Sequence, residues 1–105
     1  MNSYPEASSL FHVLSHQARL RILDELRRRE ACVCHLQAVL KRPQAYVSQQ
    51  LRVLREAGLV TDERDGILVY YYLTDGQVER LLEDVLGRAG GPRCVNGCTC
   101  PCCQT

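Results

Sequence analysis

The sequence lacks any apolar run long enough to cross a membrane. Its first residues, Met1 to Pro5, have neither the basic nor the apolar region of a secretory signal. We therefore expect a cytoplasmic protein whose thiols stay reduced. The seven cysteines among 105 residues then indicate metal ligands or redox sensors rather than a disulfide framework.

Catalytic patterns are also missing. No Ser/His/Asp set, glycine-rich phosphate loop or carboxylate pair stands out in so short a chain, so we do not expect an enzyme. A chain of 105 residues fits one domain with a modest core, and dimerisation would bury more of its apolar surface.

The net charge of +1 hides an uneven distribution along the chain. Residues 1–60 hold nine Lys/Arg and five Asp/Glu, whereas residues 61–105 hold four and seven. The halves therefore carry +4 and −3. The basic half is the one that phosphate groups would attract.

Helical spacing of apolar residues predicts helices over residues 6–14, 15–29, 33–40 and 43–57, with Ser15 as the N-cap of the second. Pro43 breaks the third helix and can begin the fourth. Because the fourth helix is apolar on one face and polar on the other, the third and fourth helices together predict a helix-turn-helix.

Two β-rich runs, residues 59–64 and 67–73, follow this motif and are separated by Asp65-Gly66, a strong hairpin signal. A hairpin in this place is the wing of a winged helix, and Thr74 or Asp75 would cap a last helix ending near Leu86. The expected fold is α+β and mainly helical, with the order ααααββα and a two-stranded wing. Residues 1–87 would form the dimeric DNA-binding domain, and residues 88–105 a flexible cysteine-rich tail.

The expected partner is double-stranded operator DNA. Gln44, Ser48 and Gln49 can read base edges, while the arginines should act mainly on phosphates. The predicted DNA-contacting residues are Gln44, Tyr46, Ser48, Gln49, Arg52, Arg55 and Arg64.

The cysteines fall into two clusters with none between Gln37 and Leu86. One is Cys32-Val33-Cys34, and the other lies in the tail and comprises Cys94, Cys98, Cys100, Cys102 and Cys103. Residues two apart on an ideal helix point to different sides, so a ligand shared by Cys32 and Cys34 needs Cys32 in or before the first turn. We expect His35 to face solvent or to cap a helix rather than bind metal.

These residues resemble the ArsR/SmtB family of bacterial metal-responsive winged-helix repressors. The segments that carry the resemblance are Ala18-Arg19-Leu20-Arg21-Ile22-Leu23, Cys32-Val33-Cys34-His35-Leu36, residues 47–60 (Val-Ser-Gln-Gln-Leu-Arg-Val-Leu-Arg-Glu-Ala-Gly-Leu-Val) and residues 66–72. The resemblance implies a homodimer paired through the first and last helices. It also implies operator binding without metal and release when metal binds.

The chain departs from the family pattern in two places. Gln37 stands where arsenic-responsive members often have another cysteine, so a third thiolate is missing from this helix. Gln77 stands where zinc-responsive members have a histidine, so a zinc site on the last helix is not expected.

We predict an inducer site formed by Cys32, Cys34 and one or more tail cysteines, with As(III) or Sb(III) favoured and Cd(II) or Pb(II) as alternatives. A sensor built from the tail alone, a thiol redox or persulfide switch and a metal-storage protein are the remaining alternatives.

Overall fold

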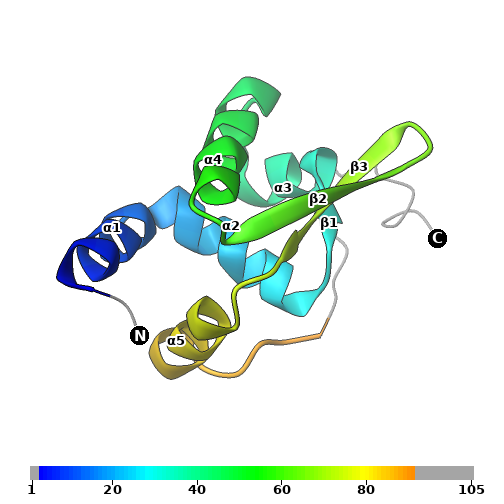
Figure 1. The fold of residues 1–105 in the computed structure, drawn as a ribbon. Coiled ribbons are helices and arrows are strands. Elements are labelled where there is room, and N and C mark those ends of the chain that lie inside the picture. Colours follow the sequence, from blue (N-terminus) through cyan, green and yellow to red (C-terminus); the bar gives the residue numbers. More distant parts are fainter. Residues whose placement is uncertain (1–2, 92–105) are drawn as a thin grey trace.

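The computed structural model describes residues 3–91, which form five helices and a small sheet whose hairpin projects away from the helices (Figure 1). The helices are α1 (Tyr4–Leu14), α2 (Gln17–Arg28), α3 (Val33–Leu40), α4 (Gln44–Glu56) and α5 (Gly76–Leu86). The strands are β1 (Ala31–Cys32), β2 (Val60–Asp65) and β3 (Leu68–Leu73), which form an antiparallel sheet in the order β1-β3-β2. None of the helices in residues 3–91 could span a membrane.

The predicted fold class is confirmed, because α3, α4 and the β2–β3 hairpin form a winged helix-turn-helix. The strand β1 was not predicted. It has only two residues, and an alternation of apolar and polar side chains cannot show in so short a run. Its pairing with β3 joins the segment before α3 to the wing.

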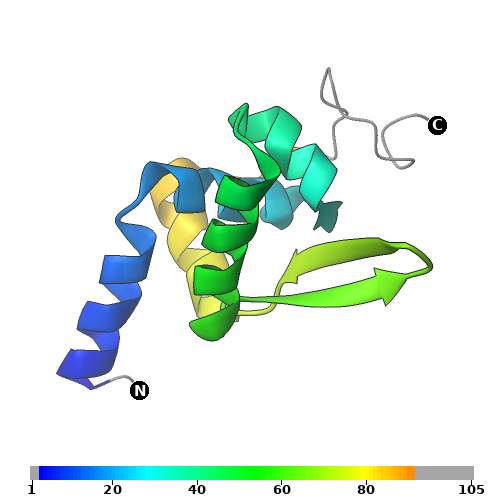
Figure 2. The same cartoon turned by 90° about the horizontal axis from the view of Figure 1, so that it is seen from above.

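The core lies among α2, α3, α4 and α5 and is closed by the base of the wing. Figure 2 shows α1 at the end of the molecule opposite the wing tip. Each central helix contributes fully buried aliphatic side chains at helical spacing. These include Ile22, Leu23, Leu36, Val47, Leu51, Leu54, Val78 and Leu82, and Leu59 between α4 and β2 is buried with them.

The first two helices begin at different residues from those expected. Ser3 caps α1, because its hydroxyl accepts from the amide of Glu6, and Pro5 is tolerated in the first turn, where no amide partner is needed. Ser15 does not cap α2. Its hydroxyl donates instead to the carbonyl of His12 at the end of α1, and His16 occupies the N-cap position.

The hairpin turn lies one residue later than the prediction. Asp65 pairs with Leu68, so the two loop residues are Gly66 and Ile67 rather than Asp65 and Gly66. Only Gly66 has a positive φ, of 65°, as in a type II′ turn with glycine at the first central position. Because Gly66 alone supplies this conformation, Asp65 can remain in the ladder.

The packing of α4 gives a first prediction. Leu54→Ala should lower the free energy of unfolding by about 2–5 kcal/mol, because Leu54 is fully buried and its removal leaves a cavity. Ile67→Ala is the control, since Ile67 is 95% exposed at the wing tip and should change stability by less than about 0.5 kcal/mol. Urea unfolding of both variants provides the measurement, and similar losses would contradict this account of the core.

Candidate DNA-reading face and thiol pair

The outer face of α4 presents most of the residues predicted to contact DNA. Pro43 is the N-cap, with an extended backbone, and the helix buries Val47, Leu51 and Leu54. The predicted residues Gln44, Ser48, Gln49, Arg52 and Arg55 are all exposed, whereas Tyr46 is half-buried. Polar side chains that can reach base edges are therefore gathered on one side of the helix, as base reading requires.

Arginines of α2 fix the position of this helix. Arg19 Nε donates to Gln50 Oε1 on α4 at 2.9 Å, and its Nη1 donates to the carbonyl of Val13 on α1 at 3.3 Å. Arg21 Nη2 donates to the carbonyl of Val39 on α3 at 2.8 Å. These contacts tie α1, α3 and α4 to α2, so the orientation of α4 is set by the helices behind it.

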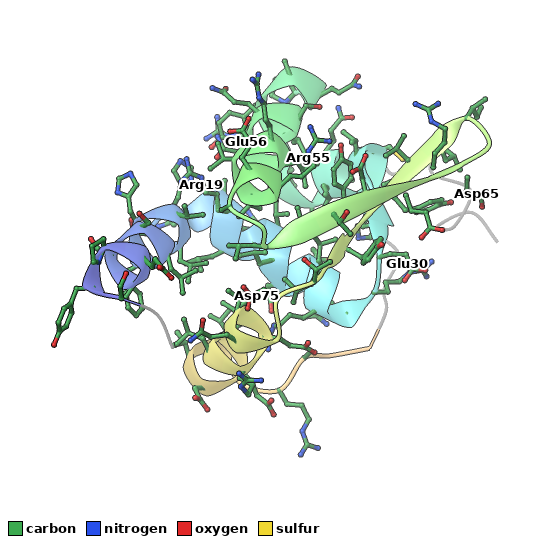
Figure 3. The ribbon with its side chains drawn as sticks, in the orientation of Figure 1. Arg19, Glu30, Arg55, Glu56, Asp65 and Asp75 are labelled. Atoms are coloured by element: carbon green, nitrogen blue, oxygen red, sulfur yellow. The ribbon has the colours of Figure 1, made fainter. Side chains whose placement is uncertain are left out.

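The predicted phosphate-binding arginines lie close to carboxylates. Arg52 Nε is 3.1 Å from Glu56 Oε1, and Arg55 Nη1 is 3.6 Å from Asp62 Oδ1 on β2. Figure 3 shows Arg55 and Glu56 near the end of α4 and Asp65 at the wing tip. Arg64 lies in a hairpin that also carries Asp62, Glu63 and Asp65, so the hairpin has a net charge of −2. Exposed pairs of this kind are weak, but they reduce the positive charge available to phosphates.

Arg42 belongs to the candidate DNA face but was missed from the sequence. Its guanidinium lies 5.1 Å from the ring centroid of Tyr46, in a stacking contact at the start of α4. A hollow of about 280 Å³ opens beside it and is lined partly by His16, Arg21 and Arg42. The sequence signal that could have identified Arg42 is its place as a basic residue just before the first turn of a recognition helix.

Cys32 and Cys34 lie side by side at the start of α3. Cys32 is the last residue of β1 and the N-cap of α3, with extended φ and ψ of −85° and 167°, and Cys34 is in the first turn. Their Sγ atoms are 2.7 Å apart. The extended backbone at Cys32 therefore removes the separation that two helical positions would impose, and both sulfurs could contact one ion.

The thiol pair is connected to the wing as well as to the helix-turn-helix. Cys32 is the register partner of Tyr70 on β3, while α3 packs against both α2 and α4. A change in the position of these two sulfurs would therefore affect the candidate DNA face in two ways, through β3 of the wing and through the contact of α3 with α4.

His35 corrects one expectation, because it neither faces solvent nor caps a helix. It is 5% exposed, and its Nε2 is 3.1 Å from Oε1 of Glu25, which is 3% exposed on α2. Arg28 Nε lies 3.6 Å from the other oxygen of Glu25. A buried carboxylate needs such partners, so the contact between His35 and Glu25 helps to hold α3 against α2.

Within residues 3–91 no group of three His, Cys, Asp or Glu side chains is arranged to hold a metal ion. Cys32 and Cys34 could supply two thiolates there. The other predicted ligands, Cys94, Cys98, Cys100, Cys102 and Cys103, lie outside the described residues. The predicted boundary after residue 87 follows the end of α5 and stays a prediction.

Comparison with known proteins agrees with the winged helix-turn-helix fold. Residues 16–62 match the family described as bacterial regulatory protein, arsR family. The arsenical resistance operon repressor of Bacillus subtilis is 39% identical, over 72% of this chain and 73% of the relative. The chain belongs to the ArsR/SmtB family. This membership confirms the expectation of a regulator rather than an enzyme.

Other relatives are named for different roles. The transcriptional repressor SmtB homologue of Synechocystis is 41% identical over 76% of this chain. The cadmium resistance regulator CadC of Listeria innocua is 34% identical, over 75% of this chain and 67% of the relative. The ArsR/SmtB chain spans only 61% of the Synechocystis protein.

Among solved structures, the homodimeric winged helix-turn-helix domain Mb0332 of Mycobacterium bovis superposes with a TM-score of 0.71 at 28% identity. The match covers 78% of this chain and 76% of that one. The ArsR/SmtB fold is thus shared by a protein that is described as a dimer.

The exposed face of α4 gives a second prediction. Gln49→Ala should weaken binding to a specific duplex by roughly 1–3 kcal/mol and leave random DNA nearly unchanged, because an amide side chain acts on base edges. Arg42→Ala is the contrasting variant, which should weaken both and lower the salt dependence. Fluorescence anisotropy on both duplexes at several salt concentrations measures this, and equal losses for Gln49→Ala would show that it is no base reader.

Proposed function

We propose that this ArsR/SmtB chain is a transcriptional repressor that binds operator DNA as a homodimer and is released by a thiophilic metal or metalloid ion. The observation that carries the proposal is the 2.7 Å separation of the Cys32 and Cys34 sulfurs at the start of α3. This helix packs directly against α4, whose exposed face carries Gln44, Ser48 and Gln49.

The donor set favours soft ions. Thiolate ligands select As(III), Sb(III), Cd(II) or Pb(II) over ions that prefer oxygen, and we favour As(III) or Sb(III). Cys32 and Cys34 would hold the ion together with one or more tail thiolates, because Gln37 offers no thiol. The ion would supply a fixed link between these thiolates.

The chain's own residues explain how such a link would act on DNA binding. Cys32 belongs to β1, which pairs with the wing strand β3, and Cys34 belongs to α3. Fixing the two sulfurs constrains the wing and the helix behind α4 together. In a dimer this biases the spacing of the two recognition helices, which must match successive major grooves.

The proposed dimer gives a third prediction. Exposed apolar side chains gather on α1 and α5, where Phe11 is 58% exposed and Val85 is 70% exposed. Burying such side chains in an interface is favourable, so sedimentation under dithiothreitol should show a dimer at micromolar concentration. Phe11→Glu with Val85→Glu should give a monomer, with Ile67→Glu at the wing tip as control. A wild-type monomer would contradict both the interface and the two-half-site model.

The shared thiolate site gives a fourth prediction. Cys32→Ser, Cys34→Ser and deletion of residues 92–105 should each preserve DNA binding and lose or weaken release by the ion. Each substitution removes one thiolate of the proposed site, and the deletion leaves only two thiolates, which are too few for a trigonal site. The measurement is the anisotropy of a promoter duplex during titration with As(III), Cd(II), Pb(II) and Zn(II). A normal response of the Cys32/Cys34 double variant would instead make the tail the sensor.

The same sulfur separation favours a second candidate, a redox switch. Two thiols this close could lose two protons and two electrons to an oxidant and form a disulfide. Loss of DNA binding under diamide without metal, reversed by dithiothreitol, would support this candidate over the metal sensor.

A further inference from the structure

The hollow beside Arg42 lies where the start of α2, the end of α3 and the start of α4 meet. Its volume is about 280 Å³, and its polar lining includes Gln17, Arg21 and Arg42. All the residues that line it lie within residues 3–91, and none of them is acidic. An anion in the hollow would therefore meet positive charge and no carboxylate in the lining.

The two arginines of the hollow are positioned by the turn between α3 and α4. Arg21 Nη2 donates to the carbonyl of Val39, near the end of α3, at 2.8 Å. Arg42 precedes Pro43, which disfavours a helical backbone at Arg42, and its guanidinium carbon lies 5.1 Å from the centroid of the Tyr46 ring. Because these contacts already restrict both side chains, binding an anion would cost them little further freedom.

The start of α2 adds backbone donors to the same hollow. His16 is the N-cap, its side chain makes no capping hydrogen bond, and the first helical bond runs from the amide of Leu20 to the carbonyl of His16. The amides of Gln17, Ala18 and Arg19 precede this bond and have no helical acceptor. In addition, Nδ1 of His16, another lining residue, is buried and has no hydrogen-bond partner within residues 3–91. The positive end of the α2 dipole thus adjoins the hollow with donors still to be satisfied.

We propose that this hollow binds a phosphate group, which Arg21, Arg42 and the amides at the start of α2 hold together. Guanidinium groups and the first amides of a helix are both suited to phosphate oxygens. Here they come from separate segments, because Arg42 belongs to the turn before α4 whereas the other donors belong to α2. A bound phosphate would therefore link α2 to the start of α4.

The expected source of the phosphate is the backbone of DNA, and this step rests on the proposed function. Tyr46 lines the hollow from the first turn of α4, and Gln44 is exposed in the same turn. A duplex whose base edges reach Gln44 has a sugar–phosphate strand at the border of that groove. A phosphate in the hollow would fix the register of α4 in the groove. Free phosphate from solution is the other possible source.

The test places one carboxylate in the lining of the hollow. Gln17→Glu keeps the length of the side chain and adds a negative charge in the first turn of α2, which suits the helix dipole but repels an anion. Gln77→Glu is the matched control, because it makes the same change in the first turn of α5, outside the hollow. Thermal unfolding checks that both variants are folded.

Inorganic phosphate is the first probe, added to full-length protein without metal at constant ionic strength, with chloride as the reference anion. The backbone amide resonances of Gln17 and Ala18 should shift and saturate with phosphate in the wild type and in Gln77→Glu. Gln17→Glu should weaken this binding at least several-fold, because its carboxylate repels the anion. Equal phosphate binding by the two variants would overturn the site.

A random-sequence duplex is the second probe, followed by fluorescence anisotropy at several salt concentrations. Gln17→Glu should reduce the slope of log affinity against log salt by about 0.9 for each protomer relative to Gln77→Glu, because one phosphate contact is lost. A reduced slope supports the site and makes DNA the source of the phosphate. An equal slope together with selective loss of inorganic phosphate binding also supports the site but makes free phosphate the ligand.

The two probes also separate this inference from the proposed function. If the wild type binds no duplex but Gln17→Glu selectively loses inorganic phosphate, the repressor fails and the phosphate site stands. If the wild type binds duplex, the two variants have equal salt slopes and no inorganic phosphate binds, the phosphate site fails and the repressor stands.

Discussion

Glu25 brings a carboxylate into the contact between α2 and α3, where it is almost completely removed from solvent. A buried carboxylate is costly unless polar partners surround it. Here the partners of Glu25 are His35 from α3 and Arg28 from α2, the helix that also carries Glu25. This requirement fixes the first turn of α3 against α2. The position of Cys34 beside Cys32, and the support that α3 gives to α4, both depend on it.

The thiol pair owes its geometry to a change of backbone conformation between its members. Cys32 closes a strand and Cys34 opens a helix, so side chains that two helical residues would point apart instead converge. The same change places the pair at the junction of the sheet and the helix-turn-helix. A ligand at this point would act on two elements of the candidate DNA face, whereas a ligand on the last helix would act on neither directly.

The features that follow from local sequence were predictable. Pro43 and the stripe of Val47, Leu51 and Leu54 define α4 and its outer face, because both signals lie within the helix itself. The features that depend on distant partners were not. The burial of His35 requires Glu25, ten residues earlier on another helix, and the hydrogen bonds that Arg27 and Arg28 donate to the carbonyls of Gly87 and Gly91 join residues about sixty positions apart. The turn at Gly66 was misplaced by one residue because Asp-Gly fits two turn types.

The distribution of charge on the candidate DNA face indicates where the proposed repressor would contact phosphates. The wing carries a net charge of −2, and Arg52 and Arg55 lie against carboxylates near the end of α4. Phosphates would therefore be attracted more strongly to the start of α4, where Arg42 stacks on Tyr46, than to the wing. Gln44, Ser48 and Gln49 lie in the same half of the helix, so specificity would rest on base contacts there. One protomer would then make few phosphate contacts, and tight operator binding would require two protomers together.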